Sequence, residues 1–427
     1  MKRLFIATAF AAAAVFGFAN GQDEASTDSG VFGGDDVTLR FVMDGTVEQQ
    51  AWMDELLADF NAEYPNIGVE VIWTPVGAEG WGGYFTKIKT MIASGQSPDL
   101  AMVASEGFQL LHEGKLAVPL NDYVEAHPEL VDEYEDIHTK LQNACIIDGN
   151  LYGFAWNWNN VVTHINLDML EAANLPFPSA KWNKEEFLRY AQAMTIEKDG
   201  KKQYGTFIPN YNFMITGWLY NFGASVLNDE MSAAALETPE MQECMQFMHD
   251  LIYKYGVSPA PIPGDNFISM MTNRQVAMTF GGRWPVPAFV NADLNFDIQY
   301  VPSFNTNQVV YGTSMFPVMT ASKHPEEAFI FSAWLSGRRS QEVYLSSFSI
   351  PTRLSVMDKV LPANPPENAQ LFKTSADSAR VVQAPAQFPE VEAAFMRAFN
   401  TIMSDPNADI SGILSASNSD INEILSR

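Results

Sequence analysis

A short segment between Asp148 and Asn166 joins aromatic rings to side-chain amides, which is a combination suited to binding. Its centre is the run WNWNN at residues 156–160, with Asp148-Gly149 before it and a β-branched run after it. Indole rings offer flat apolar faces, and amides both donate and accept hydrogen bonds. A ring that bears many hydroxyl groups needs both. We interpret the segment as half of a binding cleft; the alternative is a core Trp pair beside turn-capping Asn residues, because most Trp side chains are buried for packing.

The elements expected around this segment alternate strands with helices. Strands are predicted at residues 37–43, 68–73 and 100–103, with an amphipathic helix after each. This order predicts a largely parallel sheet covered on both faces. Polar loops at the carboxyl ends of such strands are where open α/β sheets bind ligands. We read residues 74–83 as one such loop.

The second half of the chain continues the alternation. The helix that begins after Thr238 carries a stripe of Met side chains, which we interpret as core rather than as a metal site. The last long helix is expected to begin at Pro389. Further strands are predicted at residues 204–208, 276–280, 297–301 and 315–319, and further helices from Asn183, Pro325 and Ser340.

Length and charge restrict the class of protein. A chain of 427 residues suits two or three domains. The 25 basic and 51 acidic side chains give a net charge of −26, so long-range repulsion opposes binding to nucleic acid or to anionic membranes. The six His residues have no metal-ligand spacing, and no cofactor is expected. Cys145 and Cys244 are expected to be buried free thiols.

The N-terminus has the pattern of an export signal. Lys2-Arg3 precedes an apolar run that ends in small residues, which predicts a signal peptide at residues 1–21. Residues 22–36 are rich in Gly, Ser and acidic side chains, which predicts a flexible tether. Since the first Cys is Cys145, we expect a periplasmic protein without a lipid anchor; the alternative is an uncleaved anchor helix.

Seven sequence segments together resemble the extracellular solute-binding proteins of ABC sugar importers, the group that includes the maltodextrin-binding protein. They occur in the family's order and span nearly the whole mature chain. The segments are FNAEYPNIGVEV (60–71), SGQSPDLAMV (94–103), GKLAVPL (114–120), DGNLYGFAW (148–156), HINLDMLEAANL with PSAKWNKEEFLRYAQAM (164–194), NRQVAMTFGGRWP (273–285) and SIPTR (349–353).

The resemblance implies the two-lobed α/β fold of periplasmic binding proteins, each lobe a mostly parallel sheet flanked by helices. Lobe 1 would hold residues 37–155 and 315–354, and lobe 2 residues 156–311 and 358–427. The hinge would lie near residues 155–158, 311–315 and 353–360. The lobes would close on a sugar and deliver it to the membrane permease subunits of an ABC importer, and the protein would be a monomer.

Residue chemistry and this resemblance together select the candidate ligand-binding residues. Ordinary loop polarity is the alternative for the polar ones. The loop of Glu79 has no firm counterpart in the family's pattern, and MDGT at residues 43–46 departs from it. For stacking we select Trp156, Trp158, Trp218, Trp284, Trp81 and Tyr211; for hydrogen bonding Asp44, Glu79, Glu106, Asn157, Asn159, Asn210, Arg283, Ser314 and Arg353; and Gly282 for close backbone approach.

Three other functions are compatible with the sequence. An exported glycosidase is one, since the acidic residues could supply a carboxylate pair, although G-x-S-x-G, H-E-x-x-H, P-loop and paired C-x-x-C motifs are absent from the sequence. The same fold could bind a polyamine, a metal complex or a glycerol phosphate. A peripheral adhesin or scaffold is the third.

Overall fold

The computed structural model describes residues 36–427, apart from residues 46, 78–79, 132, 199, 262–266, 345–348 and 364. The predicted signal peptide, all but the last residue of the predicted tether, and Glu79 lie outside the described residues.

The first lobe is built on a parallel sheet of order β2-β1-β3. Its strands are β1 (Val37–Met43), β2 (Ile67–Trp73) and β3 (Leu100–Ala101), and α1 (Val47–Glu63) and α2 (Gly80–Ala93) connect them. Phe41 of β1 and Phe60 of α1 are fully buried, which joins helix to sheet. The predicted alternation is confirmed here. The loop predicted at residues 74–83 is shorter than expected, because α2 already begins at Gly80 and takes Trp81 into its first turn.

The second lobe is built on a sheet of order β11-β8-β12. The strands β11 (Met278–Gly281) and β12 (Phe296–Gln299) both pair with β8 (Val162–Asn166) in the antiparallel direction. The two outer strands therefore run parallel to each other, and β8 departs from the expected parallel arrangement. The strand β8 follows β7 of another sheet after a single residue, so it enters this sheet directly from a neighbouring strand and not from a crossover helix.

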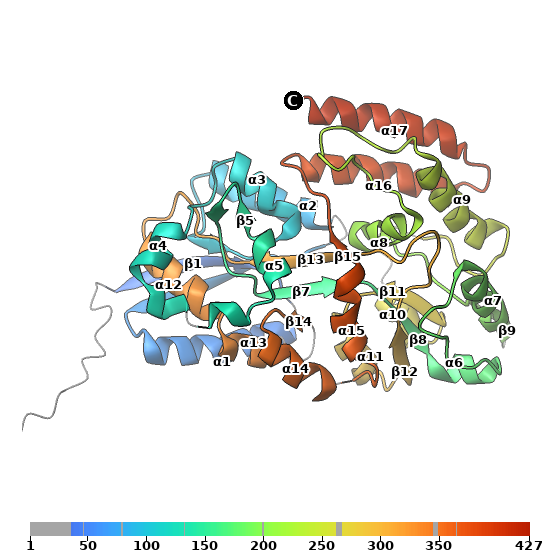
Figure 1. The fold of residues 1–427 in the computed structure, drawn as a ribbon, viewed down its shortest axis with the longest axis horizontal. Coiled ribbons are helices and arrows are strands. Elements are labelled where there is room, and N and C mark those ends of the chain that lie inside the picture. Colours follow the sequence, from blue (N-terminus) through green and yellow to red (C-terminus); the bar gives the residue numbers. More distant parts are fainter. Residues whose placement is uncertain are drawn as a thin grey trace, which may run out of the picture. The chain divides into compact units, whose positions relative to one another are not determined.

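A third sheet lies between the two lobes. Its order is β14 (Ile350–Pro351), β7 (Asn157–Asn160), β13 (Val309–Met315) and β15 (Ala379–Val381), and β4 (Val103–Ala104) also pairs with β13. Figure 1 shows β7 and β13 running between the part that holds β1 and the part that holds β8, β11 and β12. The WNWNN run is therefore an interior strand for most of its length.

Several predicted elements differ from the structure. Residues 311–314, expected as a connecting loop, form most of β13, and the strand expected at residues 315–319 does not extend past Met315. Residues 204–208 form only an isolated bridge, from Tyr204 to Val276. A further helix, α17 (Ile410–Leu425), follows the one expected to be last, because its Ser- and Asn-rich sequence weakens the apolar pattern.

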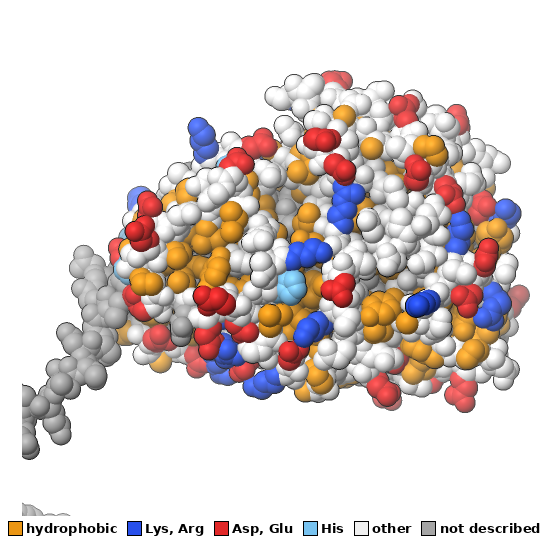
Figure 2. Space-filling model, in the orientation of Figure 1, with side chains coloured by type: hydrophobic (Ala, Val, Ile, Leu, Met, Phe, Trp, Pro, Cys, Tyr) orange, Lys and Arg blue, Asp and Glu red, His pale blue; other side chains and the backbone are white. Residues whose placement is uncertain are grey.

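The core of the second lobe gathers α8 (Asn212–Phe222), α9 (Pro239–Tyr253), α16 (Phe388–Ser404) and α17. The Met stripe of α9 is fully buried in this core, as predicted, and both cysteines are buried and free. Acidic side chains are dispersed over the face shown in Figure 2, with Lys and Arg side chains among them. Among the described residues, no helix is long and apolar enough to cross a membrane.

A tight turn at Asp148-Gly149, with φ of 50° and 78°, joins β5 and β6 as the sequence predicts.

The remaining elements cover the sheets or connect them. These elements are α3 (Phe108–Glu113), α4 (Asn121–Ala126), α5 (Thr139–Ala144), β5 (Ile146–Ile147), β6 (Asn150–Leu151), α6 (Leu167–Ala172), α7 (Lys184–Met194), β9 (Ile196–Lys198), β10 (Lys201–Gln203), α10 (Phe267–Thr272), α11 (Val286–Asn291), α12 (Pro325–Leu335), α13 (Arg338–Tyr344), α14 (Leu354–Ala363), α15 (Gln370–Thr374) and the 3-10 helices η1 (Ser105–Gly107), η2 (Pro128–Val131), η3 (Tyr134–Asp136) and η4 (Ser375–Ser378).

Candidate functional site

Tyr211 lies where side chains from both lobes meet. It directly precedes α8, in an extended conformation that starts the helix. The pKa of its hydroxyl is raised well above the ordinary value by burial and by the nearby carboxyls of Glu106, Glu392 and Asp44, and a hydrogen bond from the Trp81 side chain acts in the opposite direction. One phenol is therefore hydrogen-bonded to an indole and influenced electrostatically by three carboxyls, all from segments far apart in the sequence. We take this convergence as the candidate site.

The first lobe contributes two carboxyls to this site from the carboxyl ends of its strands. Asp44 follows β1, is half-buried, and accepts a hydrogen bond from the Val76 backbone N–H at 2.8 Å. Glu106 lies in η1 and is 3% exposed; Ser105 Oγ, 3.4 Å from its Oε2, is its nearest side-chain partner. Burial raises the pKa of both carboxyls, that of Glu106 to about 7. Both residues were selected from the sequence for this strand-end position.

A glycine in β13 makes room for Glu106 beside the second lobe. A Cβ atom at Gly312 would lie 3.1 Å from Ser105 Oγ and 3.2 Å from the Phe213 ring of α8. Both distances are shorter than a Cβ atom normally makes. Because Gly312 has no side chain, η1 and α8 can both approach β13 at this position.

Trp284 adds an aromatic face from the second lobe. It is half-buried, and its ring centroid lies 6.5 Å from that of Tyr211 and 6.2 Å from that of Phe213, both nearly edge-on. Its indole covers Gly282, where a Cβ atom would lie 2.1 Å from the ring. The close backbone approach predicted at Gly282 is therefore made to Trp284. Trp81 lies in the first turn of α2 and stacks on Phe85 with ring centroids 5.9 Å apart.

Glu392 of α16 completes the cluster and was missed in the sequence. It is 7% exposed, its Oε2 accepts a hydrogen bond from the Gly82 backbone N–H at 2.9 Å, and the Asn212 side chain is its second partner. Burial raises its pKa to about 8, and the Glu106 carboxyl adds to the rise. The available signal was a carboxylate on the buried stripe of α16, between Phe388 and Phe395 at helical spacing.

A small cavity adjoins Glu392 on the side of the second lobe. Its volume is about 20 Å³, enough for one water molecule. Its lining residues are Asn212, Thr216, Tyr220, Val226, Leu227, Gln383, Phe388, Val391, Glu392 and Phe395.

Three of the selected tryptophans are buried away from this cluster. Trp156 is 0% exposed, and its indole N–H donates to Ser340 Oγ at 3.1 Å. Trp158 is 2% exposed and donates to the Pro351 carbonyl oxygen at 3.1 Å. Trp218 is 2% exposed and stacks on Phe304 with ring centroids 5.0 Å apart. These rings have no free face for a ligand in this structure, so the core alternative describes Trp156 and Trp158 better than the stacking role, and Trp218 is packed in the core as well.

The amide and hydroxyl candidates divide between structural and open positions. Asn159 bridges the Arg283 backbone N–H, at 3.0 Å, and Ser349 Oγ, at 3.1 Å. Asn157 and Ser314 are buried opposite each other in β7 and β13. Asn210 is half-buried, and its side-chain oxygen has no hydrogen-bond partner among the described residues. Asn210 therefore has an unpaired acceptor and directly precedes Tyr211 in the sequence.

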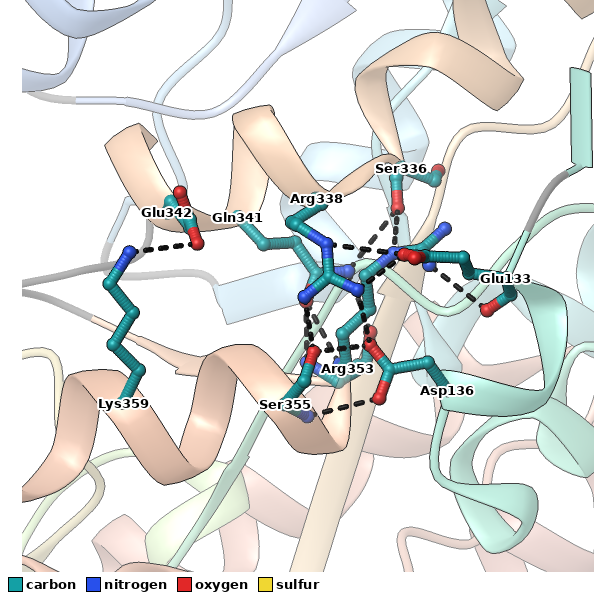
Figure 3. A network of polar contacts seen from close by, with 10 residues as sticks. Glu133, Asp136, Ser336, Arg338, Gln341, Glu342, Arg353, Ser355 and Lys359 are labelled. Carbon is teal, nitrogen blue, oxygen red and sulfur yellow. Dashed lines mark hydrogen bonds and ion pairs between the residues drawn. The ribbon is translucent and has the colours of Figure 1, made fainter.

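The two selected arginines are engaged in structural contacts. Arg283 is 0% exposed, its Nη1 donates to the Ser349 carbonyl oxygen at 2.5 Å, and burial lowers its pKa to about 10. Arg353 is 6% exposed and donates to the carbonyl oxygens of Ser336, at 3.2 Å, and Glu133, at 3.1 Å. Figure 3 shows Arg353 inside a polar network that also holds Asp136, Arg338, Gln341 and Ser355. The ligand role selected for Arg353 does not fit these contacts.

Within residues 36–427 and outside the gaps given above, no group of three or more His, Cys, Asp or Glu side chains is arranged to hold a metal ion.

A family model, that of the bacterial extracellular solute-binding proteins, matches residues 44–342. This chain belongs to that family. The fold of this solute-binding protein is similar to that of an ABC substrate-binding protein from Listeria monocytogenes in complex with cycloalternan, with a TM-score of 0.83 and 21% identity, covering 92% of this chain and 100% of that one. It is also similar to that of a solute-binding protein from Thermotoga lettingae bound with α-D-tagatose, with a TM-score of 0.78 and 22% identity, covering 91% of this chain and 99% of that one.

A curated relative matches over a shorter stretch. It is the arabinooligosaccharide-binding protein of Halalkalibacterium halodurans, 25% identical over 166 residues, which are 38% of this chain. The match spans 34% of that relative's length. The predicted two-lobed fold and family are confirmed, whereas the lobe boundaries and the ligand-binding residues stay predictions.

Proposed function

We propose that this solute-binding protein captures a carbohydrate between its two lobes and delivers it to the permease subunits of an ABC importer. One observation carries the proposal: Tyr211 is hydrogen-bonded to Trp81 of the first lobe, its ring centroid lies 6.5 Å from that of Trp284 of the second lobe, and the carboxyls of Asp44, Glu106 and Glu392 are near enough to raise its pKa. A ligand that touched residues of both lobes would favour the closed arrangement, because only differential contact shifts such an equilibrium.

The residue types suit a sugar for two physical reasons. The faces of Trp81, Tyr211 and Trp284 match the apolar C–H faces of a pyranose. The carboxyls of Asp44 and Glu106 can accept hydrogen bonds from ring hydroxyls in a water-poor site. A site built to satisfy hydroxyls rejects analogues that lack them, since each stranded polar group costs about 1 to 3 kcal/mol.

Export, monomeric state and lack of catalysis belong to the same proposal. The family is extracellular, which supports the predicted signal peptide and a place outside the cytoplasm. That the protein is periplasmic and has no lipid anchor is part of the proposal. Periplasmic binding proteins act by hinge closure around the ligand. Incubation with oligosaccharides followed by product analysis tests the inference that the protein is not a glycosidase, and any turnover would contradict it.

A thermal-shift screen against mono-, di- and oligosaccharides tests the proposal. A ligand that binds only the folded state raises stability by RT ln(1 + [L]/Kd), about 2.7 kcal/mol at a hundredfold excess over Kd. Trp81→Ala should abolish most of the shift. Tyr253→Ala is the matched control, because Tyr253 is an exposed aromatic residue on α9. If no sugar shifts the unfolding temperature, the carbohydrate proposal is wrong.

A solute that carries a basic nitrogen is the second candidate. Three carboxyls gather near Tyr211, and no described Lys or Arg is among the groups that shift the pKa of Asp44, Glu106 or Glu392. A cationic amine would neutralise them and lie against the aromatic faces. Chito-oligosaccharides of one length, with and without N-acetyl groups, form a matched ligand pair, and a polyamine tests the amine alone. Stronger binding of the deacetylated form would support this candidate.

A phosphate ester fits less well. Arg283 and Arg353, the two basic residues selected from the sequence, donate to backbone carbonyl oxygens in the interior. These contacts already engage both guanidiniums with backbone acceptors.

A further inference from the structure

One hydrogen bond joins the two lobes directly across the candidate site. The Gly82 backbone N–H, in the first turn of α2, donates to Glu392 Oε2 at 2.9 Å, and both residues are buried. Helix α2 belongs to the first lobe, where the Tyr84 hydroxyl donates to the Met102 carbonyl oxygen at 2.9 Å. Helix α16 belongs to the second lobe, where Phe395 lies in the core. The contact therefore exists only while the lobes are together.

Glycines make this contact sterically possible. A Cβ atom at Gly82 would lie 2.5 Å from Glu392 Oε2 and 3.0 Å from the Pro389 Cα atom. A Cβ atom at Gly80 would lie 2.9 Å from Glu392 Oε1, and Gly80 also has a φ of +64°. Backbone atoms of Pro389 cannot move aside as a flexible side chain does. Any larger residue at position 82 would hold α2 away from α16.

We propose that Glu392 and the first turn of α2 form a latch that holds the two lobes closed before any solute binds. This inference depends on the proposed function in one respect, namely that the protein captures its solute by closing the two lobes. The N-terminal turn of a helix carries free N–H groups and a partial positive charge, which favour a carboxyl oxygen there. Asn212 holds the same carboxyl from the second lobe, so that Glu392 is oriented toward α2.

The latch has a consequence for affinity. A solute that binds the closed arrangement has an apparent Kd equal to its intrinsic Kd divided by the closed fraction. Losing this hydrogen bond leaves a buried carboxyl oxygen without its donor, which changes such an equilibrium roughly five- to a hundredfold. The latch would thereby raise apparent affinity for every solute alike, whereas Tyr211, Trp81 and Trp284 would decide which solute binds.

The electrostatic surroundings of Glu392 agree with this role. It faces the Glu106 carboxyl of η1, the Asn212 side chain of α8, the Tyr211 phenol that precedes α8, and the Gly82 N–H of α2. Burial raises its pKa to about 8. When neutral, the carboxyl keeps an oxygen that accepts from Gly82 and gains an O–H donor, so protonation preserves the contact and removes the cost of a buried charge.

The test measures the distance between the lobes in the full chain without solute. A pair of spin labels at Glu113→Cys on α3 and Ser411→Cys on α17 reports this distance, since both positions are exposed and the native Cys145 and Cys244 are buried. Gly82→Ala should lower the ratio of closed to open molecules at least tenfold. Alanine favours helices over glycine, so α2 itself should become more stable.

Two further variants separate the latch from general damage. Gly77→Ala is the matched control: it precedes the same helix, and a Cβ atom there meets nothing within 4 Å, so the distance distribution should not change. Glu392→Ala should open the lobes as Gly82→Ala does, whereas Glu392→Gln keeps an acceptor and should stay closed.

The outcomes separate the latch from the proposed function. A solute-free wild-type protein with no closed population, or one whose distances Gly82→Ala leaves unchanged, overturns the latch even if sugars bind. Opening by Gly82→Ala together with no thermal shift from any sugar supports the latch and overturns only the carbohydrate proposal.

Discussion

The side-chain oxygen of Asn159 accepts a hydrogen bond from the backbone N–H of Arg283 at 3.0 Å, and its side-chain nitrogen donates to Ser349 Oγ at 3.1 Å. One amide of β7 thus joins the turn that carries Trp284 to the segment before β14. The asparagine selected from the sequence as a ligand-binding residue positions another candidate instead.

Asn159→Ala should therefore weaken ligand binding without removing a ligand contact. Two hydrogen bonds are lost, which costs about 1 to 3 kcal/mol of stability, and a misplaced Trp284 should raise the Kd roughly tenfold. Thermal unfolding and calorimetric titration with the sugar found in the screen measure the two effects. Asn295→Ala is the control, since the Asn295 side chain makes an exposed hydrogen bond to Asp168. Unchanged stability and affinity would contradict this positioning role.

Gly282→Ala should displace the Trp284 indole. The added methyl group would lie 2.1 Å from the ring and 2.8 Å from Asn159 Oδ1. We expect a loss of about 1 to 3 kcal/mol from overpacking and a weaker ligand complex. The neighbouring Gly281→Ala is a matched control, because its methyl group would meet the Phe267 ring at an ordinary 3.4 Å. Equal behaviour of the two variants in unfolding and ligand titration would refute the argument.

Stability should fall as pH rises from about 5 to about 9. The folded-state pKa is raised by burial to about 8 for Glu392 and about 7 for Glu106, from ordinary values of 4.5. Between the ordinary and raised values the folded state binds more protons than the unfolded state, so the free energy of unfolding decreases with pH in that window. Unfolding temperatures measured across this range test the direction.

The variant Glu392→Gln should flatten the upper part of that profile, since the amide does not titrate. Glu390→Gln, an exposed change in the same turn of α16, should leave the profile as it is. The pKa values of the Asp136 and Glu243 carboxyls are lowered in the folded state, so these groups make stability rise with pH, but only at pH values below the ordinary carboxyl pKa. A rise in stability between pH 6 and pH 8 would be inconsistent with these two raised pKa values.

Arg353→Ala should destabilise the protein without changing affinity for the sugar. Its guanidinium satisfies the carbonyl oxygens of Ser336 and Glu133, and orphaning buried acceptors costs on the order of 3 kcal/mol. Arg339→Ala is the control: its ion pairs with Glu55 and Asp59 are exposed and should contribute at most about 1 kcal/mol. Urea unfolding and ligand titration separate the effects, and a large rise in Kd for Arg353→Ala would restore its ligand role.

The strand-helix alternation of the first lobe could be predicted because each element depends on neighbours in the sequence. Apolar residues alternate along Val37–Met43, which indicates a strand, and large apolar residues recur every four positions from Trp52 to Tyr64, which indicates a helix. The same rule located Asp44 and Glu106 at strand ends, where the structure brings them to one site.

The partners of the aromatic side chains could not be predicted in this way. Trp156 and Trp158 have the composition of a binding segment, yet both are buried: Trp156 packs against the Phe316 ring and donates to Ser340 Oγ, and Trp158 donates to the Pro351 carbonyl oxygen. The pairing of strands distant in the sequence decides which indole faces are covered, and no local pattern records it.

The sequence alone determined the first sheet and the strand-end carboxyls, because periodicity and turn chemistry act over a few residues, and the resemblance of seven segments to known proteins indicated the family. Only the tertiary structure decided that Glu392 meets Gly82, 310 positions earlier, and that Trp284 rather than Trp156 lies by Tyr211. Such contacts follow from how two lobes pack, and the energy that selects them is distributed over the whole core rather than written in any one segment.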